Sequence, residues 1–500
     1  MDPSTLQTAS FFAFLAFAAG FSAFAFLLYV LRLKSLCDCE TCASYVSSLW
    51  RKDFDNLCDW YAHLLKRSPT GTINVHVIGN VITANEKNVE HLLKGRFENY
   101  PKGKSFSAIL GDLLGGGIFN VDGDSWWFQR KMASLELGSV SVRAHAFEIV
   151  ALEIEDRLIP LLSSVAGRVP GDGVLDMQDV FRRFSFDTIC KFSFGVDPGC
   201  LDLSQPISEF ATAFDTASRL CAERGMAPMP LVWKIKRAFN LGSERRLRGA
   251  IKMVNSLADE VINQKRKMGN HRASVQNDLL ARFMSSVDDD RQLRDIVVSF
   301  LLAGRDTVAS ALTSFFWLLS LHPEVKSSIR KESDRVIGST IGVATFDQLR
   351  KMQYLHAAVY ECMRLYPPVQ FDSKYAQDDD ILPDGTFIQK GTRVTYHPYA
   401  MGRMEQLWGP DCLQFRPERW LNDDGVFSPE SLYKYPVFQG GARVCLGKEM
   451  AIMEIKSVAS ALIQRFDFGI AVDGWTPRFA PGLTATIKGG LPAVIERRCC

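Results

Sequence analysis

Residues 438–447 read FQGGARVCLG, and a helical pattern that ends near Phe466 begins directly after them. A glycine-rich turn lets backbone N–H groups point at the sulfur of Cys445, and the N-terminus of the following helix adds positive potential. Both features stabilise a thiolate, the form of cysteine that binds a metal ion. For a single cysteine before a helix, a purely structural role is the alternative.

Five positions of this stretch fit the pattern F-x-x-G-x-R-x-C-x-G, namely Phe438, Gly441, Arg443, Cys445 and Gly447. The pattern resembles the haem-binding signature of the cytochrome P450 family. The resemblance implies that Cys445 is the proximal ligand to the iron of haem b and that Arg443 meets a haem propionate. It also implies that Phe438 packs beside the sulfur and that Gly447 lies against the cofactor.

Residues 295–322 form a helical run that is apolar nearly all round, which predicts a buried central helix. Its middle, residues 303–307, reads AGRDT, and glycine and an acid–threonine pair are poor choices for a core helix. They suit a helix that opens locally, with Gly304 allowing close approach to a bound ligand. The stretch resembles the family motif A-G-x-[DE]-T, which implies that Thr307 and Asp306 deliver protons to bound oxygen. The alternative for Thr307 is a hydroxyl bonded back to its own helix.

Three further motifs resemble those of the family. Glu361 and Arg364 match E-x-x-R, and Arg419 lies in a stretch that matches P-x-R. The resemblance implies that these three form a buried charged network with a structural role. Trp126 and Arg130 match W-x-x-x-R, which implies contacts to a haem propionate.

Position 127 departs from the family, because Trp127 stands where most relatives have arginine. This puts in doubt one basic contact on the surface where a reductase is expected to dock.

The N-terminal region predicts a membrane anchor. Residues 11–31 carry no charge and as a helix would span about 30 Å, the thickness of a bilayer core. A cleaved signal peptide is the alternative, but it needs a basic start, and Asp2 is the only charge before the run. Arg32 and Lys34 follow the run, which predicts a single-pass protein of the endoplasmic reticulum whose catalytic domain is cytosolic.

The sequence therefore divides into a membrane anchor (1–34), a linker with a first helix (35–70) and a haem-thiolate monooxygenase domain (71–500). The expected fold is mainly α with small β-sheets, the cytochrome P450 fold, preceded by one transmembrane helix. Residues 72–84 predict a β-hairpin, and a loop is expected near 98–118. The formal net charge of +2 gives no reason to expect a nucleic-acid partner.

Cys37, Cys39 and Cys42 cluster just after the predicted anchor. A zinc site there would need further ligands nearby, and the sequence offers none, so structural or palmitoylated thiols are favoured. The terminal pair Cys499 and Cys500 is a further candidate for lipidation.

Residues 98–126 and 184–201 resemble plant fatty-acid ω-hydroxylases and relatives that act on jasmonoyl-amino acid conjugates or sterol side chains. The resemblance implies a membrane-bound monooxygenase that hydroxylates the terminal (omega) carbon of a lipid-like substrate, with a fatty acid favoured. It would use O2 and electrons from NADPH, passed on by a separate diflavin NADPH-cytochrome reductase. Candidate pocket residues, each of which could instead be a core residue, are Phe106, Leu110, Phe119, Met226, Val308, Val369, Phe371 and Leu483.

Two other functions are alternatives to this interpretation. A haem enzyme that isomerises or dehydrates oxygenated lipids needs no reductase, but such enzymes can dispense with the acid–threonine pair present here. A non-catalytic, haem-binding membrane protein is the remaining alternative, and coupled NADPH consumption would separate the two classes.

Overall fold

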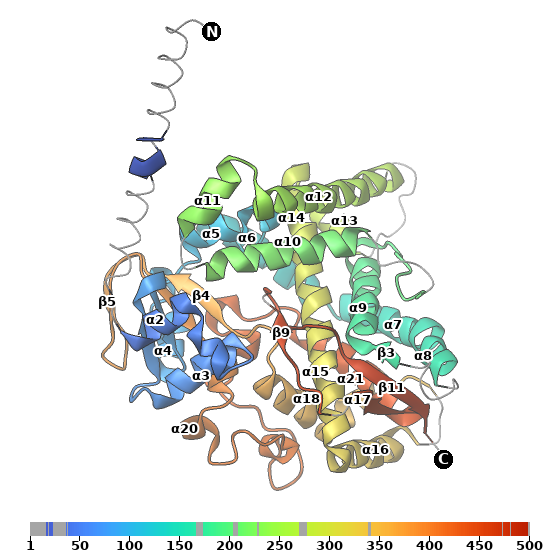
Figure 1. Ribbon diagram of the computed structural model, residues 1–500. Coiled ribbons are helices and arrows are strands. Elements are labelled where there is room, and N and C mark those ends of the chain that lie inside the picture. Colours follow the sequence, from blue (N-terminus) through green and yellow to red (C-terminus); the bar gives the residue numbers. More distant parts are fainter. Residues whose placement is uncertain are drawn as a thin grey trace, which may run out of the picture.

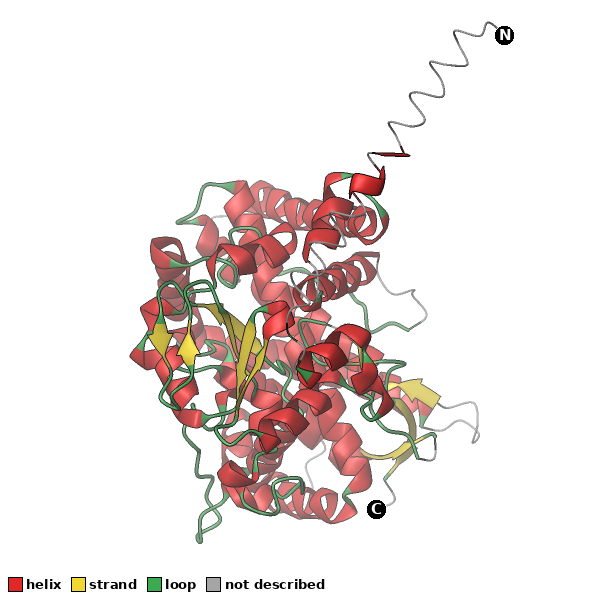
Figure 2. Cartoon of the chain, turned by 60° about the vertical axis from the view of Figure 1, so that its left-hand side comes forward, coloured by secondary structure: helices red, strands yellow, loops and turns green. Residues whose placement is uncertain are grey.

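The structure is a computed structural model. It describes residues 17–18, 20–23, 37, 39–166, 174–203, 209–227, 230–269, 278–338, 342–472, 474–480 and 482–498. Helices make up most of the described chain, and the strands gather in a few small sheets (Figure 2). This confirms the mainly α class with small β-sheets.

Helices form most of the described chain up to Leu365, and after a stretch of strands, turns and loops one more long helix follows from Lys448. In the first half they are α2 (Glu40–Ser47), α3 (Leu57–Arg67), α4 (Glu86–Glu90), α5 (Gly103–Leu114), α6 (Gly123–Gly138), α7 (Val140–Glu153), α8 (Ile159–Val165), α9 (Met177–Phe194), α10 (Glu209–Met226), α11 (Pro230–Ala238) and α12 (Gly242–Gly269). In the second half they are α13 (Leu279–Met284), α14 (Asp290–Leu301), α15 (Thr307–Leu321), α16 (Pro323–Ile337), α17 (Phe346–Lys351), α18 (Gln353–Leu365), α19 (Pro398–Met401), α20 (Glu405–Trp408) and α21 (Lys448–Arg465).

The largest sheet has four strands in the order β1-β2-β7-β4, and a second has three in the order β3-β11-β8. The strands are β1 (Thr72–Val75), β2 (Asn80–Thr83), β3 (Val174–Asp176), β4 (Asp372–Tyr375), β5 (Asp380–Ile381), β6 (Phe387–Ile388), β7 (Arg393–Tyr396), β8 (Phe466–Ile470), β9 (Phe479–Ala480), β10 (Thr486–Ile487) and β11 (Pro492–Arg497). β1 and β2 form the expected antiparallel hairpin, and Gly79 between them has a φ of 58° that glycine adopts without strain. The sheets hold together chain segments more than 300 residues apart, since β2 pairs in parallel with β7.

One continuous helix passes through the middle of the molecule, with β4 on one side and β11 on the other (Figure 1). It consists of α14, a π-helical turn η6 (Leu302–Asp306) and α15. In α15 the side chains from Val308 to Leu319 are all buried, because apolar groups cover the helix on every side. The predicted buried central helix is therefore present.

The expected loop near 98–118 is wrong in part, because α5 occupies residues 103–114. Leu110, Leu113 and Leu114 bury an apolar stripe at helical spacing, and this packing outweighs the weak helix propensity of Gly103 and Gly111.

Among the described residues, one helix is long and apolar enough to cross a membrane, and it is the central helix, Asp290–Leu321. Its most apolar window is 72% buried inside the protein, as expected of a core helix. The predicted anchor at residues 11–31 lies largely outside the described residues. Phe17 and Phe21, which are described, are exposed. The division into three segments stays a prediction.

Candidate active site around Cys445

A tight loop presents Cys445 at the N-terminus of α21. The backbone N–H of Cys445 donates to the carbonyl of Phe438 at 2.8 Å, which closes the loop. Gly441 lies within it at a φ of 59°, and a Cβ at this position would collide with the carbonyl oxygen of Leu93. Glycine is required here for both conformation and space.

Groups in and around the loop partly offset the rise in the pKa of Cys445 that burial causes. Burial raises the pKa of the Cys445 thiol, while backbone N–H groups of Gly447 and Lys448 and the positive charges of Arg130 and Lys448 lower it. The side chain of Cys445 is nevertheless accessible to solvent. A Cβ on Gly447 would meet no atom within 4 Å, so the space beside the sulfur is open. An accessible sulfur surrounded by stabilising groups, with a glycine beside open space, suits a flat ligand bound through this sulfur.

Phe438 is buried, and its ring lies 6.2 Å from the ring of Tyr360. The ammonium of Lys448, at the start of α21, lies 5.7 Å from the centroid of the Phe438 ring. Packing of Phe438 beside the sulfur stays a prediction.

Trp126 and Arg130 lie one turn apart on α6 and both reach the cysteine loop. The guanidinium of Arg443 lies 4.5 Å from the centroid of the Trp126 ring, and a guanidinium N–H of Arg130 donates to the carbonyl of Val444. Burial lowers the pKa of Arg443 despite a 2.6 Å ion pair with Asp122. The Nε of Arg443 is buried without a hydrogen-bond partner. The adjacent Trp127 is 54% exposed.

A second charged group beside the loop was not foreseen from the sequence. Asp372 on β4 pairs with Lys102 at 2.5 Å and with Lys374 at 3.1 Å, and it accepts hydrogen bonds from Tyr396 and Gln439. Burial would raise the pKa of Asp372, but the two ammonium groups outweigh it and lower the pKa. Burial lowers the pKa of Lys374 to about 7, although Asp372 opposes the shift.

The charges around Arg443 and those around Asp372 act on each other, because Arg443 interacts with both Asp372 and Lys374. Together they gather four basic side chains, Arg130, Arg443, Lys102 and Lys374, beside the cysteine loop, and the Nε of Arg443 has no hydrogen-bond partner. Lys374, with its pKa of about 7, is only partly charged at neutral pH, and the carboxylates of Asp122, Asp372 and Glu98 act on Arg443. Haem carries two propionates, and basic groups with an unpaired buried guanidinium N–H suit such carboxylates, so this donor set fits haem as the flat ligand of Cys445.

The π-helical turn η6 opens the central helix where the sequence predicts local opening. Thr307 follows it, and its hydroxyl donates to the carbonyl of Ala303 at 2.6 Å. This hydrogen bond to its own helix is the alternative stated above for Thr307. The Thr307 hydroxyl therefore does not donate to Asp306. Thr307 remains partly accessible, and its oxygen can still accept a hydrogen bond.

Asp306 is buried and faces cations instead of Thr307. Its Oδ1 lies 3.0 Å from a guanidinium nitrogen of Arg305, which also pairs with Asp215 of α10 at 2.5 Å. Burial raises the pKa of Asp306, Arg305 lowers it, and the negative charge of Asp215 raises it further. No motif or periodicity in the sequence points to Asp215, which lies 91 residues before Asp306.

The Asp215→Asn variant is expected to lower the pKa of Asp306, because it removes a negative charge that disfavours ionisation of the neighbouring carboxyl. If Asp306 governs a limb of the pH–turnover profile, that limb moves to lower pH. Asp112→Asn is the matched control, since it breaks the 2.8 Å pair of Asp112 with Arg224 on the same helix α10. Equal profiles for both variants and the parent would exclude an influence of Asp215 on the proton-handling acid.

Gly304 packs against another helix, which supplies a reason for glycine at this position that the sequence did not suggest. A Cβ here would collide with the side chain of Ile189 on α9, so close packing of α9 on η6 requires the glycine. Approach to a bound ligand stays a prediction for this residue.

Gly304→Ala is expected to cost about 1–3 kcal/mol of folding free energy, because it overpacks this contact. Adding Ile189→Ala should make the loss smaller than the sum of the two single losses. Gly249→Ala, in the exposed middle of α12 where a Cβ meets nothing within 4 Å, should be stabilising by up to about 1 kcal/mol. Denaturant unfolding measures all four variants, and additive losses would contradict the packing explanation.

The candidate pocket residues fall into separate environments. Leu110 belongs to one core cluster, and Phe106 and Leu483 pack against it together with Leu302 and Leu446. Val308 is buried in the other large cluster, which makes it a core residue.

The other candidates are not gathered with these. Phe119 is 39% exposed, Phe371 lies 5.7 Å from the ring of His397, and the carbonyl of Met226 accepts the hydroxyl of Tyr45. Val369 is partly buried after the end of α18.

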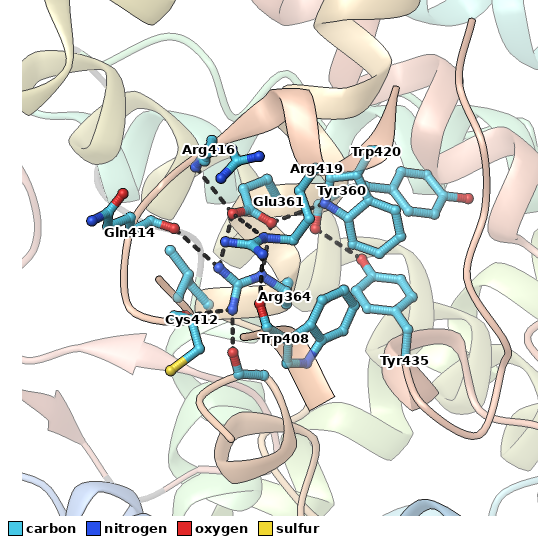
Figure 3. A network of polar contacts seen from close by, with 12 residues as sticks. Tyr360, Glu361, Arg364, Trp408, Cys412, Gln414, Arg416, Arg419, Trp420 and Tyr435 are labelled. Atoms are coloured by element: carbon cyan, nitrogen blue, oxygen red, sulfur yellow. Dashed lines mark hydrogen bonds and ion pairs between the residues drawn. The ribbon is translucent and has the colours of Figure 1, made fainter. Parts of the chain in front are cut away.

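A buried network joins Glu361 and Arg364 of α18 to Arg419 (Figure 3). Arg364 pairs with both oxygens of Glu361, at 2.7 and 2.8 Å, and Arg419 approaches Glu361 at 3.4 Å. Trp420, which the sequence did not suggest, donates to the same carboxylate at 2.9 Å. Arg364 also donates to the carbonyls of Gly402, Cys412 and Gln414, so it ties α18 to the chain that leads to the cysteine loop.

Comparison with known proteins agrees with this site. Residues 47–490 match the family model described as Cytochrome P450. The chain is 62% identical over 478 residues to Cytochrome P450 94C1 of Arabidopsis thaliana, which covers 94% of this chain and 95% of the relative. It is 47% identical over 460 residues to Cytochrome P450 94B1 of the same plant, with 90% and 89% covered. Cytochrome P450 94A1 of Vicia sativa is 42% identical over 469 residues, with 91% and 89% covered.

This chain, which matches one family over most of its length, thus has a thiol presented by a glycine-bearing loop, basic side chains beside that loop and a π-helical turn in the central helix. The chain belongs to the cytochrome P450 family and is a haem-thiolate monooxygenase with haem b as its cofactor.

Proposed function

We propose that the chain hydroxylates the terminal (omega) carbon of a lipid-like substrate, with a fatty acid favoured, and that Thr307 and Asp306 handle the protons of the reaction. When bound at Cys445, haem supplies the activated oxygen atom. The residues of the chain bind and orient the substrate, exclude water and hold the protons.

The observation that carries the substrate class is a set of apolar side chains that border one core cluster without being fully buried. Phe106 of α5, Leu302 of the π-helical turn, Leu446 of the cysteine loop and Leu483 near the C-terminus pack against this cluster, and each remains partly accessible. Partly accessible apolar groups, one of them next to Cys445 in the chain, suit a hydrocarbon chain. A narrow approach would present the end of such a chain, so that geometry favours a terminal carbon over more reactive positions.

We further propose a location in the membrane of the endoplasmic reticulum, with a diflavin NADPH-cytochrome reductase as the electron donor. Phe17 and Phe21 support attachment, since exposed phenylalanines within an uncharged stretch suit a lipid environment. Alkaline carbonate washing of microsomes should leave the full chain in the pellet, and protease added to intact microsomes should digest the catalytic domain. Release by carbonate, or protection from protease, would overturn this placement.

The substrate assignment is tested by product analysis. Membranes that carry the full chain, a plant reductase and NADPH are incubated separately with a long-chain fatty acid, a jasmonoyl-isoleucine conjugate and a side-chain-hydroxylated sterol. Terminal hydroxylation of the fatty acid is expected. Exclusive turnover of the conjugate or the sterol would move the assignment to that class. No turnover of any of the three, with an intact thiolate-type carbon monoxide spectrum, would refute the terminal-hydroxylase assignment.

A further inference from the structure

Three cysteine sulfurs meet at the start of the described domain. The ligand atoms of Cys37, Cys39 and Cys42 all lie within 4.8 Å of one another, and the thiol of Cys37 donates to the sulfur of Cys39 at 3.1 Å. Cys39 is the N-cap of α2 and Cys42 its third residue, so the turn of the helix places both side chains at the same end. The sequence favoured separate structural or lipidated thiols, and the structure instead brings the three together.

Backbone N–H groups are directed at two of the three sulfurs, although burial still raises the pKa of the Cys42 thiol. N–H groups of Thr41 and Cys42 point at the sulfur of Cys39, and the N–H of Val77 points at that of Cys42. Hydrogen bonds of this kind orient thiolate ligands and stabilise their charge. Cys42 is only 2% exposed, Cys37 is partly buried and Cys39 is exposed. An ion could therefore enter from the side of Cys39.

Two other uses of these thiols fit the geometry less well. S-acylation modifies thiols one at a time and needs access by an enzyme, which the burial of Cys42 denies. A disulfide would use two sulfurs and leave the third in contact with it, and a protein body facing the cytosol is kept reduced.

We propose that Cys37, Cys39 and Cys42 bind one soft d10 metal ion, Zn²⁺ or Cu⁺, as three thiolates. Thiolate ligands select these ions, and a site with three protein ligands leaves Zn²⁺ a fourth position for water. The ion would fasten residue 37 to α2, and the hydroxyl of Tyr45 in α2 in turn donates to the carbonyl of Met226 at the end of α10 at 2.7 Å. It would thereby fix the direction in which the chain enters the catalytic domain. This inference does not depend on the proposed substrate.

The test is the metal content of the full-length holoprotein, produced without a polyhistidine tag and purified under anaerobic conditions without chelators. Zinc and copper are measured per haem in the parent, in the triple variant Cys37→Ser/Cys39→Ser/Cys42→Ser and in Cys200→Ser as a matched control. Stoichiometric zinc or copper is expected in the parent and the control and should be lost from the triple variant. The element found tells which of the two ions the site holds.

A second variant guards against misfolding of the triple variant. Cys39 is exposed, so Cys39→Ser should retain the haem content and carbon monoxide spectrum of the parent. Its affinity for added Zn²⁺ or Cu⁺, measured by competition with a chromophoric chelator, should fall by at least about tenfold. Unchanged affinity, equal metal content in all variants, absence of metal from the parent, or a hydroxylamine-labile acyl group on these cysteines would each overturn the proposal.

Discussion

In the Cys445→Ala variant, turnover is expected to fall below detection, and haem should be retained weakly or lost. The alanine removes the sulfur toward which the N–H groups of Gly447 and Lys448 and the charge of Arg130 are directed. No other cysteine follows in the loop or in α21, so the described chain offers no neighbouring thiolate in its place. Haem content by absorption and product formation with reductase and NADPH measure the effect.

Cys221→Ala is the control for this prediction, because Cys221 is a fully buried thiol on α10, away from the cysteine loop. It should keep haem and turnover close to those of the parent. Turnover retained by Cys445→Ala would mean that the oxygen chemistry does not require this thiolate, and the assignment of the ligand would be wrong.

Glu361→Gln is expected to cost about 3–5 kcal/mol of folding free energy, because it leaves the buried guanidinium of Arg364 without its carboxylate, while Arg419 keeps its 3.1 Å pair with Asp411. Glu361 is 0% and Arg364 1% exposed, so water cannot replace the missing charge. A loss of this size is a large part of the total stability of a typical domain, about 5–15 kcal/mol. The variant should accumulate poorly and incorporate little haem, even though Glu361 has no part in the chemistry.

Glu418→Gln makes the same chemical change at the residue directly before Arg419. The Glu418 side chain is exposed and accepts a hydrogen bond from the hydroxyl of Tyr354. Its cost should stay within about 0.5 kcal/mol. Denaturant unfolding of the two variants compares them directly. Similar small losses in both would show that the buried network contributes little to the fold.

Local patterns explain how much of this molecule could be predicted. The cysteine loop, the central helix and the hairpin at residues 72–84 are each encoded within a short stretch, whose residue types and spacing suffice to predict the element. The network of Glu361, Arg364 and Arg419 was found through two short motifs. Each motif is short, although Arg419 meets Glu361 across 58 residues, and that pairing is implied only by the family resemblance.

What escaped prediction depends on contacts between distant segments. Lys102 and Asp372 pair across 270 residues, and Arg305 and Asp215 across 90. No periodicity marks which lysine a buried aspartate will meet. Gly304 was placed on the correct helix, but the face that needs glycine is set by Ile189 of α9, which sequence spacing does not reveal. The convergence of Cys37, Cys39 and Cys42 likewise depends on where α2 begins.

The central claim, a haem held by the thiolate of Cys445 in this chain, is tested most directly by the absorption spectrum of the reduced, carbon monoxide-bound full-length protein. A thiolate opposite carbon monoxide gives a strongly red-shifted Soret band, because the sulfur donates electron density to the iron. The account predicts this band for the parent and for Cys221→Ala, and its absence from Cys445→Ala. A band typical of a histidine-bound haem in the parent, or a red-shifted band that survives in Cys445→Ala, would contradict it.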